Sequence, residues 1–429
     1  MNDTPRSAQA GVVDVARLAV RLGAGALRGS RHDAGATAAQ WLREVMARDG
    51  SDSVAISIGS RRLEIVGNRD HSERILSSPP AGSGCPVGRM KREAMSFLAE
   101  RALTVTDGDA WTKLRAYNEQ VLGTGGPHPF AQAFLDQVRS AFARPVEDIV
   151  DIRKAMGRAM SGIVLGDAAG DSDAATDVTV LFGVVSSPIR RKLFASRHAG
   201  RLLRFRALLA RCWEGSAADA PTLIALARST TAAAERDTLL QQIPHWMFTF
   251  TGSGTDLLAR TLVMITARPA VLRRVRDEIA QAGPLDRAGT YSRLPLLDAC
   301  VLETGRLFPP VTRTFHFAAA GNGRSDTELV HWFPLLQRDD RLGADVHDFV
   351  PDRWLAGDRD AAANASNLFL RGPRACPGAD LILFVCRAAL VRLLTELNMR
   401  GSSDRLARDP LPVSFPAREA RFTVSEARP

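Results

Sequence analysis

The sequence predicts a mainly α-helical protein with a small β region. Residues 90–285 are predicted to be mainly helical, and within them residues 243–267 form one long apolar helix. Short alternating runs of apolar and polar residues, typical of strands, occur at 52–67 and 311–337. The chain has 429 residues, of which 45% are hydrophobic, so it can form one large domain with a substantial core. We expect an N-terminal helical arm over 1–45 and a single domain over 46–429.

The N-terminal arm contains an apolar stretch, Val12 to Leu27, whose charged residues fall near one helical stripe. Those residues are Asp14, Arg17, Arg21 and, just beyond the stretch, Arg28. The pattern predicts an amphipathic helix that lies on the protein or in solvent, with contact to a membrane surface as the alternative. We find no stretch that predicts a transmembrane helix, and no small-residue cleavage site of a signal peptide.

The remaining elements follow in chain order. Residues 52–67 predict a β-hairpin that turns at Gly59-Ser60. After the helical region and the short strands of 311–337, residues 345–375 form an irregular meander. A further helix is expected from Leu381 to Leu394, and a short β tail closes the chain.

The long helix is interrupted by the sequence Thr251-Gly-Ser-Gly-Thr-Asp256. Each of its two glycines costs roughly 1 kcal/mol of helix stability relative to alanine. A purely structural helix avoids that cost, so we expect another group to approach the backbone closely at this point.

Cys376 is the candidate metal ligand of the chain. It lies in the loop Phe369-Leu-Arg-Gly-Pro-Arg-Ala-Cys-Pro-Gly378, directly before the predicted helix. A thiolate that binds iron needs a tight loop, backbone N–H donors and the positive end of a helix dipole. The alternative is a buried free cysteine in a Gly/Pro loop, but that alternative does not explain why an aromatic residue, an arginine and two glycines lie at fixed spacing around Cys376. The other cysteines, at 85, 212, 300 and 386, form no CxxC pair, and the odd total predicts a reducing cytoplasm rather than a disulfide framework.

The loop resembles the haem-binding loop of the cytochrome P450 family, Phe-x-x-Gly-x-Arg-x-Cys-x-Gly. The positions that match are Phe369, Gly372, Arg374, Cys376 and Gly378. The resemblance implies a cytochrome P450-like fold and haem b as the cofactor. It makes Cys376 the axial thiolate of the haem iron and Arg374 a partner of a haem propionate.

Other segments match the same family. Glu303-Thr-Gly-Arg306 and the later Arg353 resemble the charge triad that supports the haem loop. Trp111 and Arg115, one helical turn apart, resemble the Trp-x-x-x-Arg segment that meets a haem propionate. Arg313 follows the Glu-x-x-Arg helix, where the family often places another propionate partner and a strand that lines the substrate pocket; Val311 is the pocket candidate there.

The interrupted helix resembles the oxygen-binding helix of the family. Gly252 and Thr255 match its glycine and threonine, and Phe248 and Thr251 share the arc expected to face oxygen and substrate. The position before the threonine usually carries an acid, but here it is Gly254. We expect the missing side chain to leave a gap that water or a substrate hydroxyl fills. Asp256 lies on another side of the helix and does not replace the acid.

The formal net charge of +9 is compatible with nucleic-acid binding, but no helix-turn-helix, zinc knuckle or aromatic–basic repeat accompanies it. The arginine clusters are therefore expected to be solvated helix faces. A more specific interpretation is a surface for an acidic electron-transfer protein, with Lys113, Arg371 and Arg387 as candidates. No Gly-x-Gly-x-x-Gly follows a strand, so electrons are expected from a separate ferredoxin and ferredoxin reductase.

These observations predict a haem-thiolate monooxygenase, an oxidoreductase that oxidises a largely apolar small molecule in natural-product biosynthesis or catabolism. The alternative is a haem-thiolate enzyme of another reaction type, either peroxide-driven or performing coupling, rearrangement or nitrogen chemistry, and Gly254 motivates it. A non-catalytic haem carrier or sensor is a third hypothesis, against which Thr255 argues.

Overall fold

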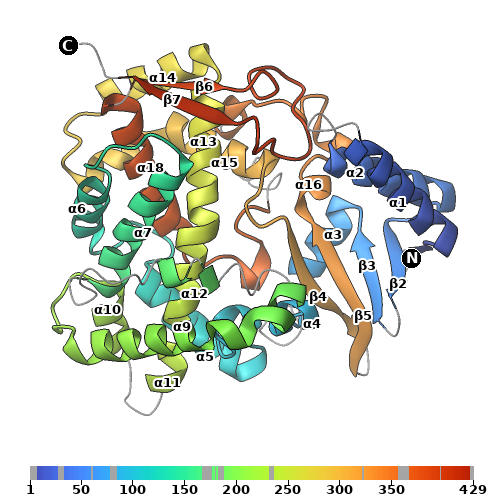
Figure 1. Cartoon of the computed structure of the whole chain (residues 1–429), viewed down its shortest axis with the longest axis horizontal. Coiled ribbons are helices and arrows are strands. Elements are labelled where there is room, and N and C mark those ends of the chain that lie inside the picture. Colours follow the sequence, from blue (N-terminus) through green and yellow to red (C-terminus); the bar gives the residue numbers. More distant parts are fainter. Residues whose placement is uncertain are drawn as a thin grey trace. The chain divides into compact units, whose positions relative to one another are not determined.

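The computed structural model describes residues 7–27, 33–58, 61–77, 85–166, 176–178, 180–181, 188–230, 236–320, 323–355, 367–396 and 398–425. The chain divides into two units: unit 1 comprises 1–91, 302–375 and 403–421, and unit 2 comprises 92–301, 376–402 and 422–429. The prediction of a mainly helical protein with a small β region is confirmed (Figure 1). The chain passes from unit 1 to unit 2 at the peptide bond between Ala375 and Cys376. The two halves of the cysteine loop therefore belong to different units.

Unit 1 is built on a five-stranded mixed sheet in the order β1-β2-β3-β5-β4. The strands are β1 (Ser7–Gln9), β2 (Ser53–Ile58), β3 (Arg61–Val66), β4 (Arg313–Ala320) and β5 (Gly323–Trp332). Pairs β2–β3 and β4–β5 are antiparallel, whereas β1–β2 and β3–β5 are parallel. The predicted hairpin of 52–67 is confirmed, although its turn lies outside the described residues. The strands expected in 311–337 are confirmed as β4 and β5; strand β1 was not expected.

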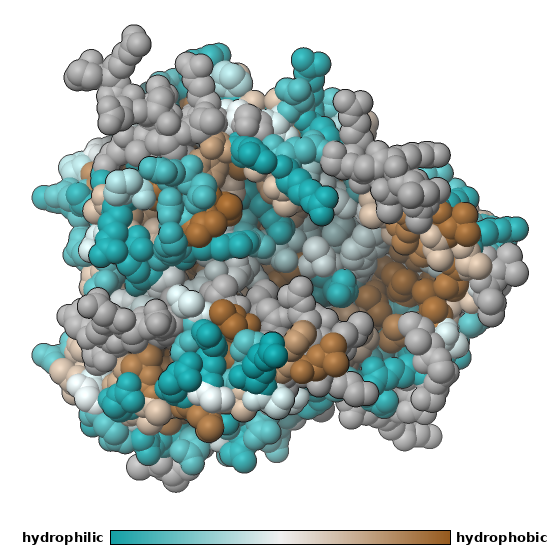
Figure 2. Space-filling view, in the orientation of Figure 1, coloured by the Kyte–Doolittle hydropathy of each residue, from teal (hydrophilic) through white to brown (hydrophobic). Residues whose placement is uncertain are grey.

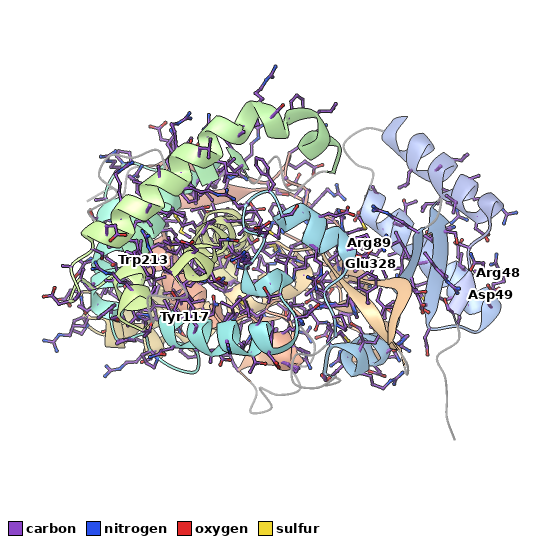
Figure 3. The ribbon with its side chains drawn as sticks, turned by 90° about the horizontal axis from the view of Figure 1, so that it is seen from below. Arg48, Asp49, Arg89, Tyr117, Trp213 and Glu328 are labelled. Atoms are coloured by element: carbon purple, nitrogen blue, oxygen red, sulfur yellow. The ribbon has the colours of Figure 1, made fainter. Side chains whose placement is uncertain are left out.

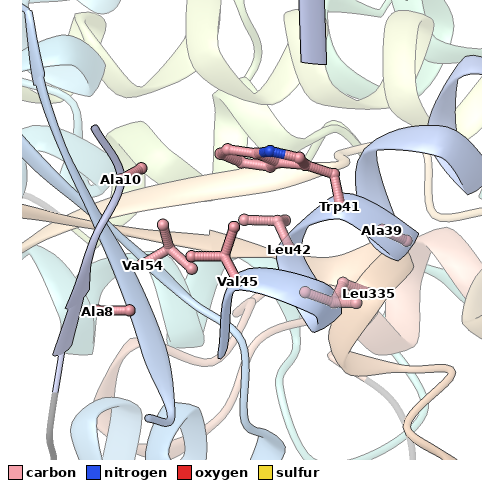
Figure 4. Packing of buried hydrophobic residues seen from close by; sticks show 8 residues of the cluster. All are labelled: Ala8, Ala10, Ala39, Trp41, Leu42, Val45, Val54 and Leu335. Atoms are coloured by element: carbon pink, nitrogen blue, oxygen red, sulfur yellow. The ribbon is translucent and has the colours of Figure 1, made fainter. Parts of the chain in front are cut away.

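Two N-terminal helices pack on this sheet: α1 (Val12–Leu27) and α2 (Ala34–Asp49). Figure 4 shows the buried cluster between α2 and the strands, in which Trp41, Leu42 and Val45 meet Val54 and Leu335. Helix α2 begins at the N-cap Asp33, whose carboxylate accepts the Ala36 N–H at 3.1 Å, because a carboxylate satisfies a donor that the first helical turn leaves open. The expected end of the N-terminal arm, residue 45, falls inside α2, and the division into arm and domain stays a prediction.

The amphipathic helix predicted for Val12 to Leu27 is present and lies on the protein: Leu18 packs against the buried cluster of Figure 4 and Asp14 is buried, whereas Arg17 and Arg21 are exposed. Asp14 and Arg21 form ion pairs with Arg48 and Glu44 of α2, at 3.0 and 2.7 Å. Val20 is 70% exposed. In Figure 2 the brown surface at the right overlies this helix and its neighbours. Within the described residues no helix is both long and apolar enough to cross a membrane.

Unit 1 also contains short helices: α3 (Arg69–Ser77), the start of α4 (Arg89–Met95), α16 (Phe333–Leu336) and the 3-10 turns at Asp340–Leu342, Pro351–Trp354 and Gly372–Arg374. Glu328 of β5 holds the start of α4, since its Oε1 accepts the Met90 N–H at 2.9 Å; Figure 3 labels Glu328 beside Arg89.

Unit 2 is mainly helical. Its helices are α5 (Gly108–Leu122), α6 (Ala131–Ala141), α7 (Ile149–Leu165), α9 (Pro188–Gly215), α10 (Leu223–Ser229), α11 (Arg236–Leu240), α12 (Gln242–Thr249), α13 (Thr255–Thr266), α14 (Pro269–Gln281), the greater part of α15 (Pro295–Leu307) and α18 (Ala379–Glu396). Short 3-10 turns lie at Leu103–Val105 and Ala288–Arg293. Helix α13 packs against α7 and α18 (Figure 1). Strand β6 (Asn398–Ser402) pairs with β7 (Arg421–Ser425), which confirms the predicted β tail.

A buried carboxylate organises the part of unit 1 that leads to the cysteine loop. Glu303 of α15 is fully buried and accepts two hydrogen bonds of 2.8 Å from Arg306. It also accepts hydrogen bonds from Arg353 Nε at 3.1 Å, Trp354 Nε1 at 2.9 Å and the Val350 N–H at 3.1 Å. Burial alone would raise the pKa of Glu303, but the hydrogen bonds and charges of the two arginines outweigh burial and hold the pKa below its usual value.

Replacing Glu303 with alanine leaves the buried Arg306 guanidinium without its carboxylate. We expect Glu303→Ala to lower the free energy of unfolding by about 3–5 kcal/mol, measured by denaturant titration. Asp345→Ala is the matched control, because Asp345 pairs with the same Arg353 but is 46% exposed. That control should cost no more than about 1 kcal/mol. Equal losses in the two variants would show that burial of the Glu303 network contributes nothing.

Candidate functional site

The first half of the cysteine loop is fixed by backbone conformation and by helix α3. Leu370 and Gly372 both have left-handed backbones, with φ of 59° and 63°. A Cβ atom on Gly372 would lie 2.4 Å from the carbonyl oxygen of Leu76, so only glycine allows this approach to α3. Arg371 adds an ion pair of 3.0 Å to Glu73 of the same helix. Phe369 is half-buried next to this turn.

The second half of the loop is fixed by the end of α5. Cys376 is half-buried, and α18 begins three residues later. The Pro377 carbonyl accepts a hydrogen bond of 2.6 Å from Thr124 Oγ1, and the Asp380 carboxylate accepts the Gly125 N–H at 2.8 Å. Cys376 therefore precedes a helix N-terminus that unit 2 holds in place from a separate segment.

Helix α5 carries the Trp111–Arg115 pair. Trp111 is 5% exposed, and Arg115 Nε donates to Glu119 Oε1 at 2.6 Å. The helix ends at Gly123, whose left-handed backbone (φ 69°) turns the chain toward Thr124. One helix thus supplies the predicted propionate partners and leads directly into the contacts that hold the cysteine loop.

The predicted long helix is confirmed as α12 followed by α13, joined by one π-helical segment, Phe250–Gly254. Thr251 Oγ1 donates to the Met247 carbonyl at 2.6 Å, and Thr255 Oγ1 donates to the Thr251 carbonyl at 2.7 Å. Threonine hydroxyls that bond to preceding carbonyls compete with the regular helix ladder. Short π-helical segments are rare in proteins, and many of those that do occur lie at functional sites. This segment contains Thr251 and Gly252, and Thr255 follows it directly.

The prediction of a gap beside Gly254 is wrong. A Cβ atom on Gly254 would lie 2.5 Å from Cδ1 of Ile382 of α18, so that side chain fills the space which an acid would occupy. Cys386 of the same helix also approaches, with its Sγ donating to the Gly254 carbonyl at 3.9 Å. Asp256 does not replace the acid, because Arg153 and Arg260 bind its carboxylate at 3.3 and 3.2 Å.

Three further predicted residues lie at or near the surface. Val311 is 49% exposed, and Arg313 is exposed with its guanidinium 6.0 Å from the ring of Phe315. Phe248 is half-buried and stacks on His245, with ring centroids 6.3 Å apart. The roles of Val311 and Phe248 in a substrate pocket, and of Arg313 toward a propionate, stay predictions.

A buried basic cluster in unit 1 was not predicted. His316 of β4 is 1% exposed, and its Nδ1 has no hydrogen-bond partner among the described residues. Burial lowers its pKa well below the usual value, and His331, Lys91 and Arg374 lower it further. His331 lies with its ring 5.4 Å from that of His316, and burial lowers its pKa to about 3. Because side chains alternate along a strand, His316 lies on the face of the sheet opposite to Arg313. The pairing of β4 with β5 is needed to show that this face is the buried one.

The other four cysteines are buried. Burial raises the pKa of the Cys85 and Cys212 thiols, and it raises that of Cys386 to about 12. Cys300 is fully buried in α15. A high thiol pKa disfavours the thiolate that binds a metal, so these sites do not compete with Cys376.

Comparison with known proteins gives the family. The family model described as "Cytochrome P450" matches residues 232–423, which contain the interrupted helix, the Glu303 network and the cysteine loop. Over these residues the chain is similar to the cytochrome P450 family. This family uses haem b with a cysteine as axial ligand, so the cofactor expected from the sequence is confirmed at the level of the family.

Curated relatives agree over part of their length. "Probable cytochrome P450 28d2" of Drosophila melanogaster is 33% identical over 168 residues, which cover 34% of this chain and 32% of the relative. "Flavonoid-6-hydroxylase" of Ocimum basilicum is 31% identical over 174 residues, covering 36% and 33%. The matched part is thus about a third of the length of these relatives.

The solved structure "Retinoic acid bound cyanobacterial CYP120A1" shares the fold. Its TM-score is 0.71 at 15% identity, and the match covers 90% of this chain and 94% of that one. The cytochrome P450 fold predicted from the sequence is therefore confirmed.

The side chains of this chain fit haem. Unit 2 offers the Cys376 thiol at a helix N-terminus, with Trp111 and Arg115 on the helix that holds its loop. Unit 1, taken by itself, contains the buried His316 Nδ1, which has no hydrogen-bond partner among the described residues, near the cations Lys91 and Arg374. An anion such as a propionate would complete a group of this kind.

The packing of Gly254 against Ile382 can be tested with a double-mutant cycle. Gly254→Asp should lower the free energy of unfolding by about 1–3 kcal/mol, because the new side chain overpacks the contact with α18. In an Ile382→Ala background the same change should cost less, with a coupling of at least about 0.5 kcal/mol. Ser253→Asp, at the neighbouring half-buried position, should cost the same in both backgrounds. No coupling at Gly254 would contradict the packing.

Proposed function

We propose that this chain is a haem-thiolate monooxygenase acting on a largely apolar organic molecule. The overall reaction consumes substrate, O2, two electrons and two protons, and yields the hydroxylated product and one water. The observation that carries the proposal is the combination, in unit 2, of the Cys376 helix N-terminus with the π-helical segment beside Thr255. Relatives named as monooxygenases, such as "Cytochrome P450 monooxygenase hkm5" of Aspergillus hancockii, support it.

In this proposal, Cys376 binds the iron, and Arg374, Trp111 and Arg115 hold the propionates, with His316 as a further donor. When bound, the haem supplies the oxygen chemistry, which thiolate ligation promotes. Arg371 and Glu73 neutralise each other beside the loop, while the N-terminus of α18 provides a favourable electrostatic environment for the sulfur.

Thr255 would orient a proton donor. In the structure its hydroxyl hydrogen points to the Thr251 carbonyl, so its oxygen lone pairs remain able to accept a hydrogen bond from a water molecule. Gly254 has no side chain that could carry a proton, and two arginines bind Asp256, so neither residue supplies the proton. A water held by Thr255 is therefore the proposed donor.

We further propose that a ferredoxin and its reductase supply the electrons, in the cytoplasm. All five cysteines are free, in keeping with a reducing compartment. Of the three basic residues suggested for docking, Arg371 and Arg387 are paired with Glu73 and Asp298 and are mostly buried. Lys113 is exposed on α5 and is the remaining candidate.

Cys376→Ser tests the ligand. We expect the reduced carbon monoxide complex of the variant to lose its long-wavelength Soret band, because a hydroxyl does not replace the thiolate. Cys85→Ser is the matched control: Cys85 Sγ donates to the Ile75 carbonyl at 2.8 Å, a bond that serine can also make. That control should keep the band. Persistence of the band in Cys376→Ser would rule out this assignment.

Thr255→Ala tests the reaction class. Substrate binding should persist, whereas a larger share of the consumed NADH should appear as hydrogen peroxide, because the proton donor is no longer oriented. Product per NADH, with and without catalase, is the measurement, and Thr261→Ala on the same helix is the control. If catalase abolishes turnover of the unaltered enzyme, the reaction is driven by peroxide and the monooxygenase proposal fails.

A further inference from the structure

Helix α9 holds most of the excess positive charge of the molecule. Residues 188–213 contain seven arginines, one lysine and no acidic residue, against a formal net charge of +9 for the whole chain. The C-terminal end of the helix is fixed, since Arg228 of α10 donates to the carbonyls of Trp213 at 3.1 Å and Ser216 at 2.9 Å. In Figure 3, α9 is the long pale-green helix near Trp213, and its side chains project away from the ribbon.

The helix has one buried side and one exposed side. The buried side carries large apolar residues, which are Leu202, Phe205, Leu208, Leu209, Cys212 and Trp213. On the exposed side, Arg197, Arg204 and Arg211 follow at intervals of seven residues and therefore form one stripe, which drifts by only about 20° per interval. At about 1.5 Å per residue, the stripe extends for roughly 21 Å.

Exposed apolar side chains border this stripe. Leu193 and Leu203 are 63% and 65% exposed, and Phe194 is 38% exposed. The Arg197 guanidinium lies 5.8 Å from the centroid of the Phe194 ring. In the lower left part of Figure 2, where α9 lies, brown and teal residues lie side by side. Exposed leucine and phenylalanine beside a row of arginines is the composition of helices that lie at a lipid interface.

We propose that the exposed face of α9 docks on an anionic lipid surface. Lipid phosphates match the guanidinium groups of the stripe, since arginine binds phosphate in a bidentate manner. Leu193 and Leu203 enter the boundary between headgroups and acyl chains, as the apolar residues of interfacial helices do. The absence of any carboxylate from residues 188–213 removes the repulsion that an anionic surface would otherwise meet.

The leucines favour a lipid surface over other polyanions. A nucleic acid or an acidic protein would use the arginine stripe but would gain little from two protruding leucines. The proposal is independent of the haem and of the reaction, because it depends only on the exposed residues of α9.

Sedimentation of the haem-loaded, full-length protein with vesicles tests the proposal. Binding is expected to vesicles that contain phosphatidylglycerol and phosphatidylcholine, not to phosphatidylcholine alone, and it should weaken at high salt. The triple variant Arg197→Gln/Arg204→Gln/Arg211→Gln should lower the partition coefficient about a hundredfold, at about fivefold per cation. Leu193→Ser/Leu203→Ser should lower it at least about tenfold.

Two control variants show whether the binding belongs to the exposed face of α9. Arg144→Gln/Arg273→Gln/Arg287→Gln removes the same charge from exposed positions elsewhere in unit 2 and should change the partition by less than about threefold. Val20→Ser alters an exposed apolar residue of α1 and should leave binding unchanged.

Four results would overturn the proposal. They are no binding to the phosphatidylglycerol vesicles, equal losses in the two arginine triples, full binding by the leucine variant, and loss of binding in Val20→Ser with both α9 variants still bound. Full binding by the leucine variant together with displacement by duplex DNA would assign the face to nucleic acid instead.

Discussion

The carboxylate of Glu303 is the interaction on which the rest of unit 1 depends. A charge without any exposure to water is strongly unfavourable unless it is paired and fully hydrogen-bonded. Here Arg306 of α15 supplies donors from before the irregular meander of 345–375, and Val350, Arg353 and Trp354 supply donors from within it. The carboxylate therefore fixes where the meander returns to α15, and so where the chain enters the cysteine loop.

Arg306 extends the same constraint to the backbone. Besides pairing with Glu303, it donates to the carbonyls of Gln337, Val346 and Asp348, at 3.0, 2.9 and 3.2 Å. These carbonyls belong to a segment with little regular structure, whose backbone makes few of the hydrogen bonds that a helix or sheet would provide. Because buried carbonyls need donors, one guanidinium takes the place that a sheet or helix would otherwise fill, and the irregular segment acquires a single conformation.

Much of this arrangement could be predicted from the sequence because the signals are local. The hairpin of 52–67, the long helix of 243–267 and the frame around Cys376 are patterns of neighbouring residues. The environment of Gly254 could not be predicted, because Ile382 lies more than a hundred residues away along the chain. Nor could the burial of His316, which depends on the register of β4 against β5. The amphipathic pattern of α1 could be predicted, but the ion pairs of Asp14 and Arg21 with α2 could not, because they depend on how the two helices pack.

The charge distribution of the chain has a consequence for how the molecule moves before it touches anything. Subtracting the eight cations of residues 188–213 from the formal net charge of +9 leaves +1 for all other residues together. The excess positive charge of the sequence is thus concentrated in one helix. Near any negatively charged surface, a torque would turn α9 toward that surface within the distance over which salt permits the field to act. Encounters with such a surface would then begin with α9 toward it.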